Sequence, residues 1–429
     1  MQMNGYVHRS RFSTEKKNES LFRDIPWPEE NALVLLEEEY KRDPDPHKIN
    51  LLGKRYKSRR LQPWVFPVVR KAKALLFHDL SVDHEYPPVG GVTEFVHPAV
   101  QLLLGSSSDA IRQQRVAKIQ TLASTGGMHT GAVLLAHYFK ERPTIYVANT
   151  AGDNHRRVFT QVGFQVKEYP YDGTQVLDCH RLIRTMRYAP RHSVFVLYAC
   201  GHPNGIDPTF AQWRSLAKVM QQKGHIPFFD CSYQGLVSGD VDKDAWAVRY
   251  FVDRGFELLA VQSFSTIFGL ASERVGNLTV VSHTAEEARR VFSQLERIQR
   301  AEVLGPPVHG LRIVSLILND PVLFGQWKAQ LQQIHRRLVS IRKAVYSRFA
   351  LLQTPGTWTI QYQKGMFWWT GLQDSQLAIL RHRYHIYIPE NGRVNLAGLS
   401  SLNMNYFVKA IHEVLYGDRH SYIDLLANP

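Results

Sequence analysis

The stretch HIPFFDC, residues 225–231, is a short apolar run that ends in polar residues. Three runs of the same kind are TIYVAN (144–149), HSVFVLYAC (192–200) and ELLAVQSFS (257–265). Short apolar runs of this kind are typical of buried strands. Segments with a helical pattern, such as residues 209–222, lie between them. This alternation predicts an α/β fold with a doubly wound, mostly parallel sheet, to which NLTVVS (277–282) adds a further strand.

The composition is that of an ordinary globular protein. The chain has 429 residues, of which 44% are hydrophobic and 21% are charged, enough for two or three lobes around a sizeable core. No apolar run approaches the roughly 18 residues that a membrane span needs. Residues 1–19 are polar and lack the apolar region of a signal peptide, so we expect a disordered tail there.

Cysteine usage and charge narrow the possible functions further. Cys179, Cys200 and Cys231 are widely spaced and odd in number, which predicts neither a disulfide framework nor a metal site, and favours a cytoplasmic location. The net charge of +14 is compatible with nucleic-acid binding, but only residues 54–60 (KRYKSRR) form a dense basic cluster. The other cations are spread along predicted helices, so solvated helix faces are the favoured interpretation and nucleic acid is not an expected partner.

The C-terminal third changes character. Thr284 and Glu287 form a capping box that predicts a helix running toward Arg300. Asp320 and Pro321 predict the start of a long helix that continues to about residue 352. Three strands are then predicted, at TWTIQYQ (357–363), MFWWTGL (366–372) and YHIYIP (384–389), and a last helix near residues 406–416. This part forms either a separate, smaller α+β lobe or a continuation of one domain.

Polar residues follow the predicted strands at the places where a sheet of this kind binds ligands, the carboxyl ends of its strands. They are Asp230, Ser232 and Tyr233 after HIPFF, and Ser263, Ser265, Thr266 and Arg274 after ELLAVQ. The run Ala123-Ser-Thr-Gly-Gly127 precedes a helix that we expect to begin near Met128, where free backbone N–H groups can hold a phosphate. Each feature alone is weak, but together they indicate an anion site.

Ten stretches carry a resemblance to a known family, the aspartate aminotransferases, and most of all to the cytoplasmic animal form. They are RDPDPHKINL (42–51), QPWVFPVVRKA (62–72), DHEYPPVGG (83–91), GIDPTFAQW (205–213), PFFDCSYQG (227–235), DAWAVRYFV (244–252), ERVGNLTVV (273–281), TPGTW (354–358), GMFWWTGL (365–372) and GRVNLAGL (392–399). These stretches follow the family's order along nearly the whole chain.

The resemblance implies a fold-type I pyridoxal-phosphate transferase and a homodimer with shared active sites. The implied divisions are an N-terminal arm (20–32), a small α+β domain (33–63 and 334–429) and a large domain with a mostly parallel seven-stranded sheet (64–333). The implied reaction transfers the amino group of L-aspartate to 2-oxoglutarate, giving oxaloacetate and L-glutamate, with pyridoxal 5′-phosphate as cofactor.

Most of the family's cofactor contacts are implied at matching positions. Asp230 would pair with the pyridine nitrogen, whose protonation makes the ring an electron sink, and His155 would support Asp230 from behind. Tyr233 and Asn204 would reach the cofactor's phenolic oxygen. The implied phosphate contacts are Ser263, Arg274, Thr125 and the Ser124 amide, with Tyr86 reaching the phosphate of the partner's cofactor.

Two arginines are implied to bind the substrate. Arg393 would hold the α-carboxylate through a bidentate fork, and Arg300 would enter from the neighbouring subunit to select the distal carboxylate. On their own, such arginines would be ordinary surface residues, and Asp230 an ordinary buried carboxylate. The family's neighbours after Arg300 are replaced here by residues 302–305 (EVLG), which makes the role of this arginine the least secure.

The chain departs from the family pattern at residues that carry out the family's chemistry. Where the family has Ser-Phe-Ser-Lys, the chain has Ser263-Phe-Ser-Thr266. The family lysine holds the cofactor as a Schiff base and moves the proton of the substrate α-carbon. A threonine hydroxyl forms no imine and is a poor base near neutral pH. No lysine lies between Lys243 and Lys328, so the neighbouring sequence offers no replacement.

Three further differences from the family accompany the replacement of the lysine by threonine. Gly152 stands where the family has a tryptophan stacked on the cofactor, a loss of about 1 kcal/mol or more of binding. The segment 202–205 (HPNG) is one residue shorter than the family's His-Asn-Pro-Thr-Gly, which disturbs the position of Asn204. The change to Ala-Ser-Thr at residues 123–125 is mild.

Three hypotheses remain. The first is a family member with lost or strongly reduced aspartate aminotransferase activity, a pseudoenzyme that still binds a dicarboxylate or, without covalent attachment, pyridoxal phosphate. The second is an active L-aspartate:2-oxoglutarate aminotransferase that uses another base. The third is a non-enzymatic interaction protein that uses the basic cluster at residues 54–60.

Overall fold

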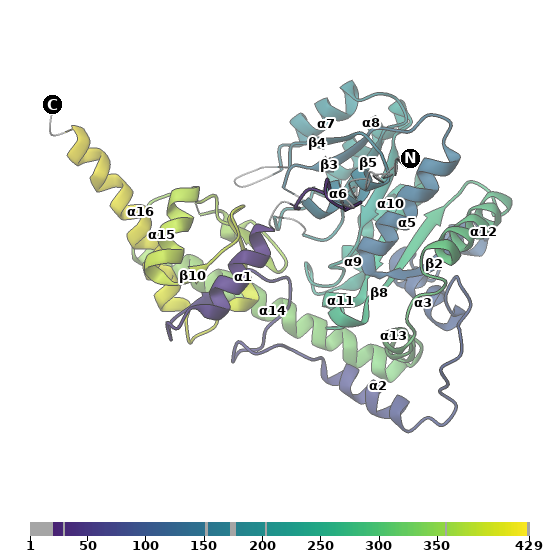
Figure 1. Cartoon of the computed structure of the whole chain (residues 1–429), viewed down its shortest axis with the longest axis horizontal. Helices are drawn as coiled ribbons and strands as arrows, with labels where there is room; N and C mark the ends of the chain where they lie inside the picture. Colours follow the sequence, from purple (N-terminus) through teal and green to yellow (C-terminus); the bar gives the residue numbers. More distant parts are fainter. Residues whose placement is uncertain are drawn as a thin grey trace, which may run out of the picture.

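The structure is a computed structural model of the chain, and it describes residues 20–28, 31–150, 153–171, 177–201, 204–356 and 358–426. Figure 1 shows a large lobe built around a sheet and a smaller lobe that carries α1, α15 and α16. Helix α14 runs from one lobe to the other. In the described part of the chain no helix is both long and apolar enough to cross a membrane.

The large lobe contains the predicted sheet of seven strands. The strands are β2 (Val116–Leu122), β3 (Ile145–Ala148), β4 (Val166–Tyr169), β5 (Val194–Tyr198), β6 (Ile226–Asp230), β7 (Leu258–Ser263) and β8 (Val275–Val281). Their order is β2-β8-β7-β6-β5-β3-β4. Strand β8 runs antiparallel to both of its neighbours, and the other pairs are parallel. The predicted α/β fold with a mostly parallel, seven-stranded sheet is therefore confirmed.

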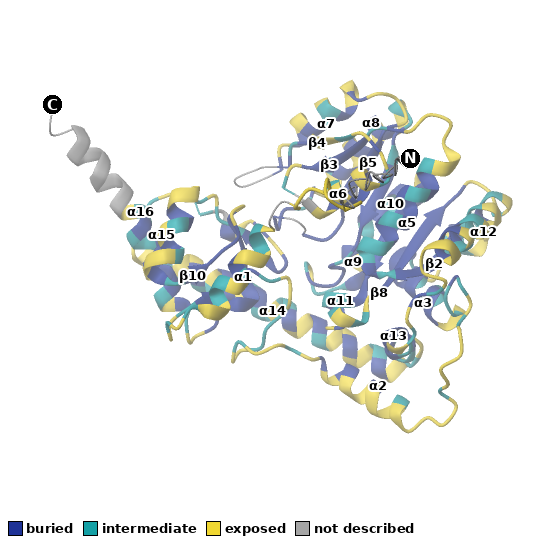
Figure 2. Ribbon diagram, viewed as in Figure 1, coloured by how far each residue is buried: buried dark blue, intermediate teal, exposed yellow. Residues whose placement is uncertain are grey.

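Helices cover both faces of this sheet and bury its central strands (Figure 2), whereas the edge strand β4 exposes Lys167 and Glu168. The helices of the large lobe are α2 (Pro67–Phe77), α3 (Thr93–Leu104), α4 (Asp109–Arg112), α5 (Ala123–Tyr138), α6 (Asp153–Gln161), α7 (Cys179–Tyr188), α8 (Phe210–Lys223), α9 (Val241–Asp244), α10 (Trp246–Asp253), α11 (Phe264–Ile267), α12 (Ala285–Glu302) and α13 (His309–Asn319). The predicted capping box at the start of α12 is confirmed, since Thr284 Oγ1 accepts from Glu287 N at 3.2 Å and Thr284 N donates to Glu287 Oε2 at 2.9 Å.

One predicted boundary is wrong. Helix α5 begins at Ala123 and not near Met128, so the run of small residues forms its first turn. The reason is packing. A Cβ atom on Gly127 would lie 2.8 Å from Val261 Cγ1, and one on Gly131 would lie 2.8 Å from Phe228 Cζ. These glycines bring the helix close to the sheet and do not mark a loop.

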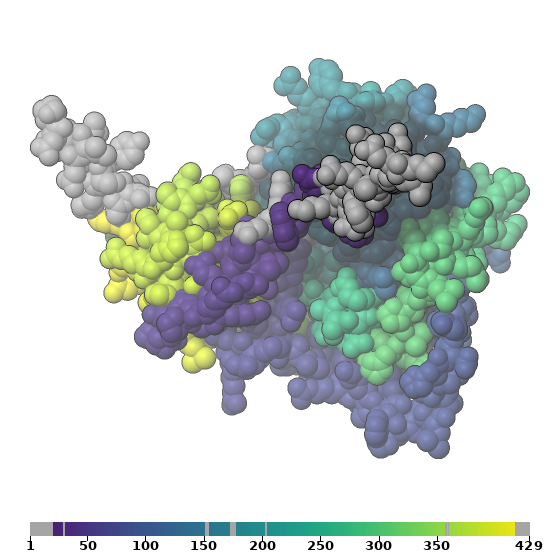
Figure 3. Space-filling view, viewed as in Figure 1, coloured from purple at the N-terminus to yellow at the C-terminus, as the bar shows by residue number. Residues whose placement is uncertain are grey.

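The smaller lobe is assembled from both ends of the chain. Its elements are α1 (Ala32–Arg42), β1 (Ile49–Asn50), β9 (Phe367–Trp369), α15 (Asp374–Tyr384), β10 (Ile386–Tyr387), β11 (Arg393–Asn395) and α16 (Met404–Leu426). Strand β1 pairs in parallel with β10, and β11 pairs antiparallel with β9. Figure 3 shows α1, in purple, lying against the C-terminal part of the chain. The predicted divisions at residues 63/64 and 333/334 stay predictions, and the second falls inside α14 (Pro321–Leu351).

The strand predicted over residues 357–363 is also wrong. The segment Thr359–Gln361 is a short 3-10 helix. Its backbone does not need a neighbouring strand, because the buried Arg342 donates to the carbonyl oxygens of Ile360 (3.3 Å), Lys364 (2.9 Å) and Gly365 (3.0 Å). A side chain from α14 thus satisfies backbone acceptors that a sheet would otherwise satisfy.

Candidate active site

The ends of the central strands carry a buried carboxylate. Asp230 is the last residue of β6 and is 6% exposed. Its Oδ2 atom lies 3.1 Å from His155 Nε2, and its Oδ1 atom accepts from the backbone N of Ser232 at 3.0 Å. The hydroxyl of Ser232 donates to the same oxygen. The structure thus brings His155 behind Asp230, as the resemblance implies.

A second group lies beside Asp230 and comes from the smaller lobe. Arg393, at the start of β11, is buried with its guanidinium 4.6 Å from the ring centre of Phe367. Tyr233 packs edge-on against the same ring, 5.5 Å between centres. Burial lowers the pKa of Arg393, and Tyr233 opposes the shift. Burial also raises the pKa of Tyr233, where Arg393 opposes the shift and Asp230 adds to it. Asp230, Tyr233 and Arg393 therefore form one electrostatically coupled cluster.

The phosphate side of the predicted site consists of the short helix after β7 and the start of α5. Ser263 caps α11, its hydroxyl accepting from Ser265 N at 3.3 Å. Ser265 Oγ is buried and has no hydrogen-bond partner among the described residues. Ser124 and Thr125 lie in the first turn of α5, where backbone N–H groups have no partner within the helix.

Arg274 faces this region from the turn before β8. The residue adopts a left-handed conformation with φ 54° and is exposed, and its Nη1 donates to Ala271 O at 3.2 Å. Its carbonyl accepts from Ala123 N at 3.0 Å, which fixes the turn against the start of α5. The close approach requires Gly276, where a Cβ atom would lie 2.5 Å from Ala123 Cα.

Thr266 is half-buried in α11. The helix is held by aromatic packing: the ring centres of Phe264 and Phe95 lie 5.4 Å apart, and Phe268 stacks on Trp327 at 4.6 Å. Trp327 Nε1 also donates to Ile267 O at 2.8 Å. The position at which the resemblance implies a lysine thus lies on a helix packed into the core, and its side chain carries no amine.

The sequence interpretation missed one residue of this site, Lys54. It was read as part of the surface cluster at residues 54–60. In the structure its ammonium interacts electrostatically with Arg393 and Asp230. Burial, with a smaller effect of Arg393, lowers the pKa of Lys54 to about 8, and Asp230 opposes the change. The residue is still accessible to water, so the shift reflects crowding by surrounding protein and not enclosure.

Three other predicted residues lie apart from this cluster or are already bonded. Tyr86 is 81% exposed on the segment before α3, and Arg300 is exposed near the end of α12. Asn204 is buried, with Nδ2 donating to Tyr171 O at 2.8 Å and Oδ1 accepting from Ile206 N at 3.2 Å. Their proposed contacts stay predictions. Gly152 and residues 202–203 lie outside the described residues.

Comparison with known proteins decides the family. The profile of the family "Aminotransferase class I and II" matches residues 46–411, most of the chain. The chain belongs to this aminotransferase family. It is 42% identical to the cytoplasmic aspartate aminotransferase of Gallus gallus over 405 residues, covering 92% of the chain and 98% of the relative.

Solved aminotransferase structures agree with this assignment. The aromatic-amino-acid aminotransferase of Burkholderia pseudomallei, covalently bound to pyridoxal phosphate, superposes with a TM-score of 0.90 at 30% identity, covering 92% of this chain and 100% of that one. The cytoplasmic aspartate aminotransferase of Saccharomyces cerevisiae gives 0.89 at 33% identity, covering 92% and 98%.

The residues of this aminotransferase fit most of the cofactor. An unpartnered buried hydroxyl at Ser265, the N–H groups at the start of α5 and Arg274 suit a phosphate. Asp230, supported by His155, suits a protonated ring nitrogen. Among the described residues the fit is incomplete at Thr266, which offers no amine, and at Asn204, whose side chain is already bonded within the chain. No group of His, Cys, Asp and Glu that would hold a metal ion occurs in the described ranges.

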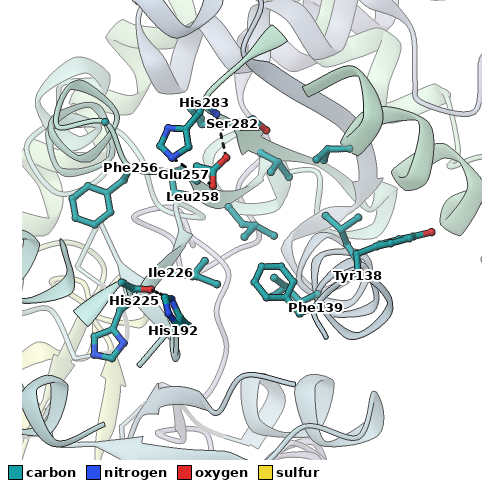
Figure 4. A pocket seen from close by; sticks show the side chains of 18 of the residues that line it. Tyr138, Phe139, His192, His225, Ile226, Phe256, Glu257, Leu258, Ser282 and His283 are labelled. Carbon is teal, nitrogen blue, oxygen red and sulfur yellow. Dashed lines mark hydrogen bonds and ion pairs between the residues drawn. The ribbon is translucent and has the colours of Figure 1, made fainter. Parts of the chain in front are cut away.

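A cavity of about 700 Å³ lies apart from this site. It is found at the opposite ends of the strands, lined by residues such as Ile226, Leu258 and His283 (Figure 4). Tyr138 and Phe139 border it from the end of α5. We take the carboxyl ends of the strands as the candidate site, because Asp230 and Arg393, charged residues from the two lobes, interact with the same groups there.

Proposed function

We propose that this aminotransferase-family protein binds pyridoxal 5′-phosphate and a dicarboxylic acid at the cluster of Asp230, Tyr233 and Arg393. We further propose that its exchange of amino groups between L-aspartate and 2-oxoglutarate is lost or strongly reduced. One observation carries the second part: Thr266 lies in α11, directly after β7, at the position where the resemblance to the family implies a lysine.

Different residues would carry the binding of ligands, which is retained, and the movement of the α-proton, which is lost. The cofactor, when bound, withdraws electrons from the substrate α-carbon. Asp230 would keep a ring nitrogen protonated, and Arg393 would hold a carboxylate by two parallel hydrogen bonds. Binding therefore depends on anchors that are present. Moving the α-proton requires a base of suitable pKa, and the Thr266 hydroxyl does not provide one.

The likeness to relatives named cytoplasmic supports a cytoplasmic location. The homodimer is proposed from membership of the aminotransferase family.

The non-enzymatic alternative receives less support from the geometry of the basic cluster. Lys57 Nζ donates inward to Asn50 O at 3.1 Å, and Lys54 faces the site, so residues 54–60 do not form one outward basic surface.

The experiment measures cofactor binding and exchange separately. Pyridoxal phosphate is titrated against the purified protein by quenching of tryptophan fluorescence, and L-aspartate:2-oxoglutarate exchange is followed through oxaloacetate. We expect saturable one-site binding, with exchange about 10²-fold or more below the 1–10³ s⁻¹ of ordinary enzymes. Absence of binding, or turnover at ordinary rates, would overturn the proposal.

A further inference from the structure

We propose that Lys54 supplies the reactive amine of this site, forming a reversible covalent bond between its Nζ and the aldehyde carbon of the bound cofactor. The inference rests on the proposed cofactor binding and makes it more specific. It departs from the sequence-based expectation of no covalent attachment.

The backbone around Lys54 is fixed against β11. Asn395 Nδ2 donates to Gly53 O at 2.7 Å and to Arg55 O at 2.9 Å, the carbonyls on either side of Lys54. Asn395 N also donates to Leu51 O at 3.1 Å. Alternate residues of a strand point to the same face, so Asn395 and Arg393 share one face of β11. The clamp therefore places Lys54 next to Arg393.

The neighbouring lysine, Lys57, has a structural role. Arg337 holds this segment by donating to Lys57 O at 2.6 Å and Ser58 O at 3.3 Å, and Lys57 Nζ is occupied by Asn50 O. Within the described parts of the chain, the Lys54 ammonium forms no hydrogen bond or salt bridge. Lys57 thus stabilises the loop, whereas the Lys54 amine is available to a ligand.

The electrostatic environment of Lys54 favours reactivity. The Lys54 ammonium interacts electrostatically with Arg393, which would bind a carboxylate, and with Asp230, which would hold the ring nitrogen. The lowered pKa of about 8 leaves a measurable neutral fraction near neutral pH, which an ordinary lysine lacks. A lysine whose pKa is lowered by a neighbouring cation is a known form of activated amine.

The covalent step balances without another reactant. The neutral Lys54 nitrogen attacks the aldehyde carbon, the C=O bond is replaced by C=N, and the oxygen leaves as water with both amine protons. No electron transfer is involved. Hydrolysis reverses the step, so the bond must be reduced to be isolated.

Two probes separate this inference from the proposed function. Pyridoxal 5′-phosphate carries the aldehyde, whereas pyridoxine 5′-phosphate has an alcohol in its place and cannot form the bond. We expect both to bind to the wild-type protein, the aldehyde at least about tenfold more tightly. Failure of both to bind would overturn the proposed function as well. Equal binding of the two would overturn only the role of Lys54.

The position of the bond is tested by reduction and peptide mapping. The wild-type protein with an equimolar amount of pyridoxal phosphate is treated with borohydride, digested and analysed by mass spectrometry. We expect one adduct per chain, on Lys54. In Lys54→Arg, which keeps the charge, we expect about tenfold less adduct or lower. The matched variant Lys57→Arg should form as much adduct as the wild-type protein. An adduct on another lysine, or an undiminished adduct in Lys54→Arg, would contradict the inference.

The pH dependence gives a third readout. The charged groups that interact with Lys54 are Asp230 and Arg393, and the neutral amine should appear as pH rises through about 8. The initial rate of adduct formation should rise over the same range. A rate that rises only near pH 10.5, as for an ordinary lysine, would contradict the inference.

Discussion

At the scale of single residues, Arg393 shows how binding is retained. Its guanidinium is buried between lobes and stacked on Phe367, so a ligand carboxylate would meet a desolvated and pre-oriented fork. Arg393→Gln removes charge-assisted hydrogen bonds that contribute about 1.5–3 kcal/mol. We therefore expect 2-oxoglutarate to bind about 10- to 100-fold more weakly, as measured by calorimetry.

The matched control is Arg289→Gln, an exposed arginine on α12. It should leave the affinity for 2-oxoglutarate within about twofold. Equal losses in the two variants would mean that general charge and not a fork at Arg393 attracts the dicarboxylate.

The site could be predicted only in part from the sequence. Asp230 and Arg393 stood in stretches that resemble a known pattern, and the structure brings them together. Lys54 was missed because its neighbours in residues 54–60 are also basic, so the sequence predicted one surface cluster. Only the clamp from Asn395 distinguishes Lys54 from Lys57, and that contact joins residues from opposite ends of the chain.

At the scale of elements, strands buried on both faces were predictable and the exposed ones were not. The runs that became β5, β6 and β7 are continuously apolar. Strand β4 lies at the sheet edge with Lys167 and Glu168 exposed, and β2 alternates with polar residues. Neither pattern signals a strand clearly, because edge strands need less apolar surface.

The contact between α5 and the sheet gives a test at this scale. In Gly131→Ala the new Cβ atom would lie 2.8 Å from Phe228 Cζ and 3.1 Å from Leu259 Cδ2. We expect a loss of about 1–3 kcal/mol in the free energy of unfolding, measured by denaturant titration. Gly325→Ala, in the exposed part of α14, has open space and should gain about 0.5–1 kcal/mol. Similar effects in the two variants would contradict the close packing.

At the scale of the whole molecule, the N-terminal arm exposes apolar side chains, as expected if it packs against a second copy of the chain. The exposed fractions are 94% for Leu21, 73% for Phe22 and 96% for Trp27, although these are large apolar side chains. Tyr86 and Arg300 are also exposed, which fits residues that act in a partner's site. Tryptophan, tyrosine and arginine side chains commonly dominate the binding energy of an interface.

We expect the double variant Phe22→Ser/Trp27→Ser to weaken the homodimer about tenfold or more in sedimentation equilibrium. Tyr188→Ser removes a comparably exposed aromatic residue from α7 and serves as the control. A dimer unaffected by loss of the arm residues would show that the arm does not contact a second copy.

The change of pattern after residue 355 left a separate smaller lobe and a continuous domain as alternatives, and only the resemblance to the family implied a small domain built from both ends of the chain. The pairing of β1 with β10 joins residues 49–50 to 386–387, a separation that local patterns do not encode. The same pairing places Lys54 against β11 and so connects the fold of the smaller lobe to the site.

The most direct test of the central claim adds the missing amine at Thr266. L-aspartate:2-oxoglutarate exchange is measured in the wild-type protein, in Thr266→Lys and in Thr266→Met, which matches the length of lysine without its amine. We predict that only Thr266→Lys raises the rate, by about 10²-fold or more. Equal rates in the three proteins would contradict the claim that this position limits the chemistry.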